Sequence, residues 1–160
     1  MSGQPTQYCP SCRAELRPNS KFCAECGAKI DKNVPTRIDF ISKDEIPKLT
    51  IKATELFTAR KLDEAIPILD NLIAAAPNSD LFLMRGQCDF FKENYYQALH
   101  FFERALELKP DGLTCNQMMG LNLFKMNRFS EAAPFLEKAL SIEYDSNIET
   151  LFKLCKQKGN

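Results

Sequence analysis

Residues 81–111 read LFLMRGQCDFFKENYYQALHFFERALELKPD, and the pattern of this stretch recurs along the chain. A small residue, a large apolar residue, an alanine and a proline return with a common period of about 34 residues. Four columns keep this period, and they are Ala53, Gly86 and Gly120; Leu62, Tyr95 and Phe129; Ala65, Ala98 and Ala132; and Pro77, Pro110 and Tyr144. A period of this length indicates stacked helix-turn-helix units, because the periodicity of a single helix cannot produce it.

The residue types suit such a hairpin of two helices. The small residue lies midway along the first helix, where the second helix must approach closely. The large apolar residue fills the turn, the alanine begins the second helix, and proline ends it because it lacks a backbone donor. Pro67 and Pro134 share one register near the start of their helices, where each removes at most about one hydrogen bond.

Residues 79–112 and 113–146 therefore resemble tetratricopeptide repeats. Residues 46–78 are a weaker third copy, with Ala53 in place of glycine and Leu62 in place of the usual aromatic residue. The resemblance implies a mainly α fold, a right-handed α-solenoid of three helical hairpins within residues 45–160. Residues 147–158 predict a capping helix with a capping box of Ser146 and Glu149, since repeat arrays need a polar end.

The segment 1–30 does not follow the repeat and contains four cysteines in two Cys-x-x-Cys pairs. Residues 8–30 read YCPSCRAELRPNSKFCAECGAKI and resemble the short zinc-ribbon module, a small β-hairpin with one metal. Two Cys-x-x-Cys pairs suit a tetrahedral Zn²⁺ bound by four thiolates. So short a segment buries too little apolar surface to fold alone, and the metal supplies about 10 kcal/mol or more. The predicted ligands are Cys9, Cys12, Cys23 and Cys26.

Four protein ligands leave no open position, so the zinc is expected to be structural and not catalytic. Arg13 replaces the glycine usual in the first knuckle. Tyr8 and Phe22, which precede the two cysteine pairs, are expected to pack as a miniature core. Two alternatives stay open for the ribbon: an iron site of the rubredoxin kind for electron transfer, and contact with RNA or DNA.

The composition argues against three classes of protein: nucleic-acid-binding, membrane-spanning and secreted proteins. The chain has 160 residues and equal numbers of basic and acidic residues, 21 of each. Proteins that grip nucleic acid usually carry a basic excess, which makes that function the less favoured one. There is no apolar run of about 18 residues and no apolar leader, so neither a membrane span nor a secretory signal is expected. Seven cysteines without a leader indicate a reducing, cytoplasmic location.

The resemblance implies that the first helix of each repeat lines a groove that holds a peptide or a helix of another protein. The predicted groove residues are Thr54, Phe57, Leu83, Gln87, Phe90, Phe91, Gln117, Leu121, Phe124 and Lys125. Three of these, Phe57, Phe90 and Phe124, are the ones most expected to serve the core instead.

Chaperone-binding relatives clamp a terminal carboxylate at positions that here hold Thr50, Thr54, Met84, Thr114 and Met118. None of these side chains carries a positive charge, so no carboxylate-clamp binding is expected. No phosphate loop or nucleophile–base arrangement is present, which favours a non-enzymatic adaptor or scaffold. Two points stay open: whether the linker segment 35–41, within linker 31–44, occupies the groove, and whether two copies pair through an exposed end.

Overall fold

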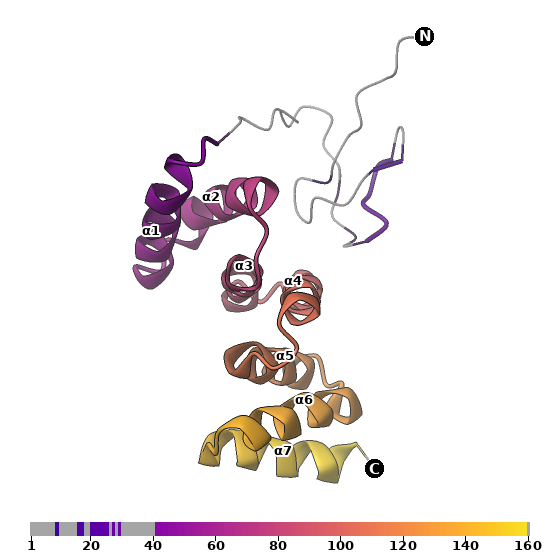
Figure 1. The fold of residues 1–160 in the computed structure, drawn as a ribbon. Helices are drawn as coiled ribbons and strands as arrows, with labels where there is room; N and C mark the ends of the chain where they lie inside the picture. The colour runs from indigo at the N-terminus through magenta and orange to yellow at the C-terminus, as the bar shows by residue number, and fades with distance from the viewer. Residues whose placement is uncertain are drawn as a thin grey trace. The chain divides into compact units, whose positions relative to one another are not determined.

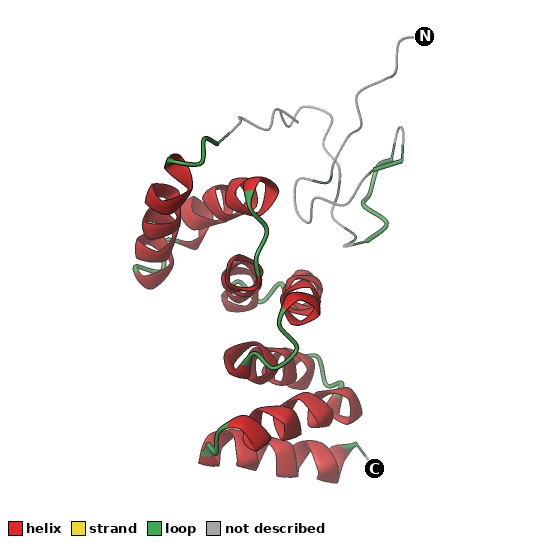
Figure 2. Cartoon of the chain, in the orientation of Figure 1, coloured by secondary structure: helices red, strands yellow, loops and turns green. Residues whose placement is uncertain are grey.

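The computed structural model describes residues 9, 16–17, 20–25, 27, 29 and 41–159. Seven α-helices occupy the continuous part, and the mainly α fold predicted from the repeat is confirmed (Figures 1 and 2). Their bounds are α1 Glu45–Thr58, α2 Leu62–Ala75, α3 Ser79–Phe91, α4 Tyr95–Leu108, α5 Leu113–Lys125, α6 Phe129–Ile142 and α7 Ser146–Lys158. In the described part of the front segment, one isolated antiparallel bridge joins Phe22 and Lys29, without a longer strand.

The chain divides into two compact units, Met1–Pro77 and Asn78–Asn160. The first unit contains the hairpin of α1 and α2. The second contains the hairpins α3–α4 and α5–α6 and the single helix α7. Within the second unit α4 packs on α5 and α6 packs on α7, so each hairpin covers the next (Figure 1).

All three hairpins turn in the same way. Arg60, Glu93 and Asn127 have positive φ angles of 61°, 61° and 60°. The amide that follows each of them donates to a carbonyl five residues back, with N–O distances of 2.9 Å. This is the Schellman ending of a helix, in which the left-handed residue is usually glycine. The left-handed backbone conformation therefore costs roughly 1 kcal/mol at each of these three non-glycine residues.

The small-residue column marks the closest approach within each hairpin of the second unit. A Cβ atom built on Gly86 would lie 2.7 Å from the Phe102 ring, and one on Gly120 would lie 2.5 Å from Leu136 Cδ2. Both distances are below any normal contact, so larger residues at these positions would force the helices apart. The close approach that the repeat pattern predicts is therefore present.

Helix α7 begins differently from the prediction. The N-cap is Asp145, whose carboxylate accepts hydrogen bonds from the amides of Asn147 and Ile148. The predicted capping box of Ser146 and Glu149 is wrong, because Ser146 is already helical and Glu149 is engaged by Lys153 at 2.9 Å. An aspartate immediately before the helix offers a better acceptor to its first amides than a serine one position later.

The core of the second unit contains one buried ion pair. Arg85 and Asp89, one turn apart on α3, are 5% and 3% exposed to solvent and are paired with each other. The Arg85 guanidinium also lies 4.6 Å from the centroid of the Phe101 ring. Burial raises the pKa of the Asp89 carboxyl, while Arg85 acts in the opposite direction. The equivalent positions on α5 hold the apolar residues Met119 and Leu123.

This difference between repeats predicts two opposite outcomes. Asp89→Leu removes the carboxylate that faces the buried Arg85 guanidinium and should lower the free energy of unfolding by about 3 kcal/mol or more. The double variant Arg85→Met plus Asp89→Leu, which copies the next repeat, should unfold within about 1 kcal/mol of wild type or be more stable. Urea denaturation followed by circular dichroism measures both. A double variant as unstable as the single one would show that the pair itself stabilises the fold.

Candidate functional site

The front segment is described at two of the four predicted metal ligands. Cys9 and Cys23 are 0% and 3% exposed, whereas Cys12 and Cys26 lie outside the described residues. The turn after the second pair is well defined at Gly27, whose φ is 71° and whose amide donates to the carbonyl of Cys23 at 3.0 Å. Only glycine adopts this conformation easily, and the turn folds the chain back toward the Cys23 backbone. Inward-facing thiols on a tight turn fit a thiolate-bound Zn²⁺.

The expected packing of Phe22 is wrong. Its side chain is 60% exposed, and Leu16 is buried instead at 8% exposure. Phe22 belongs to the bridge with Lys29, and this extended backbone turns successive side chains to opposite faces. Because Cys23 faces inward, its neighbour Phe22 faces outward. The exposed side chains Lys21 and Lys29 flank this ring in sequence and across the bridge.

The second unit presents one open side on helix α3. The residues of α3 that are buried against other helices cover one arc, and apart from the first residue, Ser79, the rest fall on a continuous arc of about 120° at 100° per residue. The residues on this arc are Asp80, Leu83, Met84, Gln87, Phe90 and Phe91. Helix α5 repeats the arrangement at every position, with Thr114, Gln117, Met118, Leu121, Phe124 and Lys125.

Helices α3 and α5 contact each other, as do α5 and α7, so the three open arcs are neighbours. On α7 the corresponding positions include Leu151 and Leu154, both half-buried. We call this surface the open face, defined by the two arcs above together with Leu151 and Leu154. Its centre is apolar, since Met84, Met118 and Leu121 are half-buried and no further helix of the second unit covers them, and Lys125 lies exposed at one end.

The structure places eight of the ten predicted groove residues on the open face. They are Leu83, Gln87, Phe90, Phe91, Gln117, Leu121, Phe124 and Lys125. The other two, Thr54 and Phe57, lie on α1 in the first unit, where Thr54 is exposed and Phe57 is half-buried. Met84, Met118, Leu151 and Leu154 also lie on the open face but were not among the predicted groove residues. The helical arc that these four share with the predicted residues is the signal that could have found them.

Two of the aromatic residues also stabilise the hairpin turns. The Phe90 ring packs edge-on against Tyr95 with a centroid distance of 5.6 Å, and Phe124 packs against Phe129 at 5.4 Å. Both contacts join the end of a first helix to the start of the second. Phe91 differs, because it is 40% exposed and touches Phe90 at 5.7 Å. Phe91 is therefore the aromatic side chain of the open face that offers most surface to a ligand.

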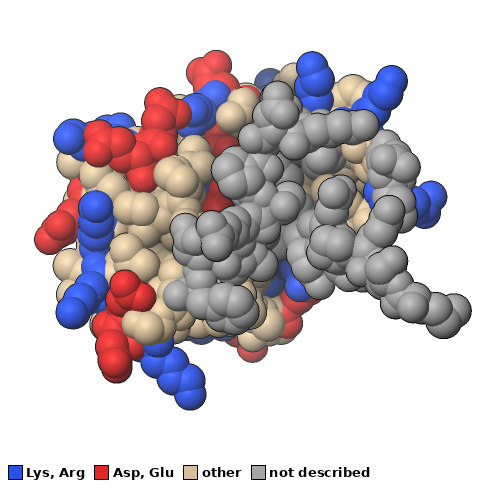
Figure 3. Space-filling view, turned by 90° about the horizontal axis from the view of Figure 1, so that it is seen from above, with Lys and Arg blue, Asp and Glu red and all other residues tan. Residues whose placement is uncertain are grey.

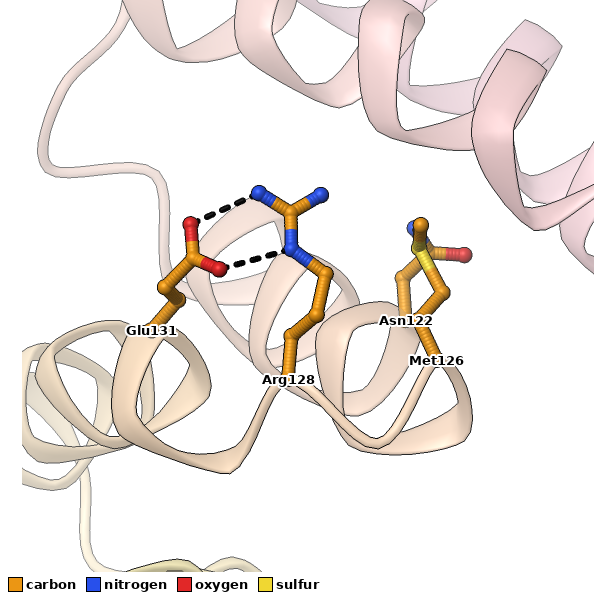
Figure 4. A network of polar contacts seen from close by, with 4 residues as sticks. All are labelled: Asn122, Met126, Arg128 and Glu131. Carbon is orange, nitrogen blue, oxygen red and sulfur yellow. Dashed lines mark hydrogen bonds and ion pairs between the residues drawn. The ribbon is translucent and has the colours of Figure 1, made fainter. Parts of the chain in front are cut away.

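Buried amides hold the open face in place from behind. Asn122 is fully buried on α5, and its Nδ2 donates to the carbonyl of Tyr95 at 2.9 Å and contacts Met126 Sδ at 3.6 Å (Figure 4). Nearby, Arg128 and Glu131 form a two-bond ion pair across the turn into α6. The Asn116 amide donates to the carbonyls of Pro110 and Gly112. These bonds of Asn122 and Asn116 tie α5 to the preceding repeat, and the sequence did not reveal them.

The cysteine side chains of the second unit face inward. Cys88, Cys115 and Cys155 are buried. Burial raises the pKa of the Cys115 thiol to about 12, so its thiolate is disfavoured at neutral pH. The hydroxyls of Thr50 and Thr54 on α1 donate to carbonyls of their own helix at 2.8 and 2.9 Å. Among the described helices, none combines the length and the apolar character needed to cross a membrane.

Comparisons with known proteins agree with both parts of this arrangement. A zinc-ribbon domain model matches residues 8–30. The chain is 27% identical over 97 residues to sperm-associated antigen 1 of Rattus norvegicus, covering 61% of this chain and 11% of that protein. It is 25% identical over 135 residues to the TPR repeat-containing protein MJ1428 of Methanocaldococcus jannaschii, covering 81% and 23%. The chain thus spans only a minor part of these relatives.

Two solved structures illustrate the fold. The first TPR domain of Spaghetti (RPAP3), bound to an HSP90 peptide, has a TM-score of 0.67 at 21% identity, with 73% of this chain and 97% of that chain covered. The Yersinia enterocolitica chaperone SycD, in complex with a peptide of the translocator YopD, has a TM-score of 0.68 at 17% identity, with 74% and 98% covered. At these identities the likeness shows the fold alone.

A family model described as "Anaphase-promoting complex, cyclosome, subunit 3" matches residues 58–139, just over half of the chain. The matched segment runs from the end of α1 into α6 and contains the open arcs of α3 and α5. The chain therefore belongs to this family of tetratricopeptide-type repeat proteins and carries a zinc-ribbon domain in front of its repeats.

Proposed function

We propose that the protein is a non-enzymatic adaptor that binds an amphipathic helix or an apolar peptide of a partner protein on the open face. One observation carries the proposal: half-buried apolar side chains recur at equal positions on three neighbouring helices, and no further helix of the second unit covers them. Met84, Met118 and Leu151 form one such row. A helix laid into a row of this kind buries its own apolar stripe, which is a common mode of peptide recognition.

The chemistry of the open face favours apolar anchors over a charged clamp. Lys125 is its one basic residue on α5, and the positions that bind carboxylates in chaperone-binding relatives hold Met84, Thr114 and Met118. The hydroxyls of Thr50 and Thr54 are already used within α1. Two of the solved neighbours are complexes with peptides, which supports peptide binding in general. The partner's identity would follow from its own apolar stripe, because a few buried anchors dominate such affinities.

The open face can be tested by a pull-down from native lysate with the double variant Phe91→Ala plus Leu121→Ala. We expect loss of the specific partners, with affinity for the main partner reduced at least tenfold in calorimetry. A control is Tyr96→Ala, which removes a ring that is 75% exposed outside the open face. If the partner set is unchanged in the first variant, the open face is not the working surface.

We further propose that Cys9, Cys12, Cys23 and Cys26 hold one structural Zn²⁺ and that the protein works in the reducing cytoplasm. The buried thiols of Cys9 and Cys23 and the left-handed Gly27 support this. A thiolate-rich donor set also explains why so short a ribbon folds, since metal binding supplies its folding free energy.

Metal analysis tests the assignment. Protein purified without added metal should contain one zinc per chain and be colourless, whereas a red protein containing iron would favour the electron-transfer alternative. Cys23→Ser should lower the zinc content at least tenfold, because three thiolates bind more weakly than four. Cys88→Ala, which removes a buried cysteine of α3, should retain full zinc and serves as the control.

A second candidate function for the ribbon rests on the exposed Phe22. An aromatic ring with Lys21 and Lys29 beside it can stack on a base while the ammonium groups contact phosphates. The visible face of the molecule carries acidic as well as basic side chains, so any such contact would be local (Figure 3).

Fluorescence anisotropy of the full chain with labelled single-stranded RNA and DNA tests this candidate. Nucleic-acid binding predicts an affinity that falls steeply between about 50 and 200 mM salt, by about tenfold or more, and that Phe22→Ala weakens. Phe91→Ala should leave the affinity unchanged. Absence of binding at the lower salt concentration would remove this candidate.

A further inference from the structure

The C-terminal ends of α4 and α6 present a repeated pair of side chains. Leu108 and Ile142 end these helices at equivalent positions one repeat apart, and they are 55% and 43% exposed. Tyr144, two positions beyond Ile142, is 70% exposed and is the equivalent of Pro110. This edge belongs to the second helices of the hairpins and is distinct from the open face, which the first helices form.

Charge alternates along the same edge. Lys109 follows Leu108, and Glu143 follows Ile142, so equivalent positions carry opposite charges. Both side chains are exposed, and no ion pair with another described residue engages either of them. Neighbouring charges are already compensated, since Lys138 pairs with Asp111 at 2.7 Å and Arg104 pairs with Glu107.

We propose that this edge is a weak, twofold-symmetric dimer interface with a second copy of the same chain. A twofold axis brings residue i of one copy to residue j of the other, and residue j to residue i. Leu108 then faces the partner's Ile142, Lys109 faces the partner's Glu143, and the reverse contacts form at the same time. Tyr144 covers the partner's Pro110 in the same register. The edge is thus self-complementary both in apolar character and in charge.

A second copy explains the edge better than an unrelated partner does. An unrelated partner would need its own matching pattern of apolar and charged positions one repeat apart, whereas this chain already contains the required complement. Two apolar side chains and one ring per copy form a small interface, which places the dimer among weak and transient complexes. Charge pairs at such a rim select the correct register more than they add affinity.

Charge exchange provides a sharp test by sedimentation equilibrium over a concentration series. Lys109→Glu alone and Glu143→Lys alone should each raise the dimer dissociation constant at least tenfold, because each produces two like-charge contacts. The double variant Lys109→Glu plus Glu143→Lys should return to within about threefold of wild type. An equimolar mixture of the two single variants should also dimerise, since both contacts then pair opposite charges.

Two further variants separate the apolar contacts from general surface effects. Leu108→Gln plus Ile142→Gln should leave a monomer at every concentration, with an unchanged circular dichroism spectrum. Ile51→Gln, which changes an apolar side chain on α1 that is 60% exposed, should dimerise as wild type does. The proposal would be overturned if the wild-type chain stayed monomeric at every concentration, or if the charge-exchange variants had the same dimer dissociation constant as wild type.

Discussion

The structure depends on the close crossing of the two helices within each hairpin. The backbone at Gly86 and Gly120 lies against Phe102 and Leu136 with no room for a Cβ atom, so each second helix approaches its first helix closely at this point. A hairpin cannot bury its apolar side alone, so each crossing prepares a surface for the next hairpin to cover. The open face follows from the same geometry, because no other helix of the second unit lies against the side of α3 and α5 opposite the crossing.

Much of this could be predicted because it follows from side-chain size and period. A column of Gly, Ala and large apolar residues constrains helix packing directly, and the columns at Gly86 and Tyr95 predicted the hairpins without reference to coordinates. The turns were harder to predict. Arg60, Glu93 and Asn127 share one left-handed conformation but no common chemistry, because the hydrogen bonds that hold them come from the backbone. A conformation that the backbone imposes leaves no trace in residue type.

The features that sequence reasoning missed are those in which tertiary contacts override local preference. The spacing of Arg85 and Asp89 is typical of ion pairs on an exposed helix surface, but both side chains are buried and Phe101 packs over the guanidinium. Phe22 reads as core by hydrophobicity, but the alternation of an extended chain beside the inward-facing Cys23 turns it outward. Of the candidate site, the register of the first helices was predictable, whereas the exposure of each member depended on its neighbours in space.

Helix α7 ends the stacking of helices on one of its surfaces and continues the open face on another. At the position of Gly86 and Gly120 it carries Lys153, paired with Glu149, so a charged pair occupies the surface on which a second helix would cross. On its opposite arc Leu151 and Leu154 keep the apolar character of Met118 and Leu121. The helix therefore covers α6 and adds Leu151 and Leu154 to the open face. It also places polar side chains on the surface against which no further helix of the second unit packs. One helix can meet these three requirements because residues at intervals of about 100° assign each of them a separate arc.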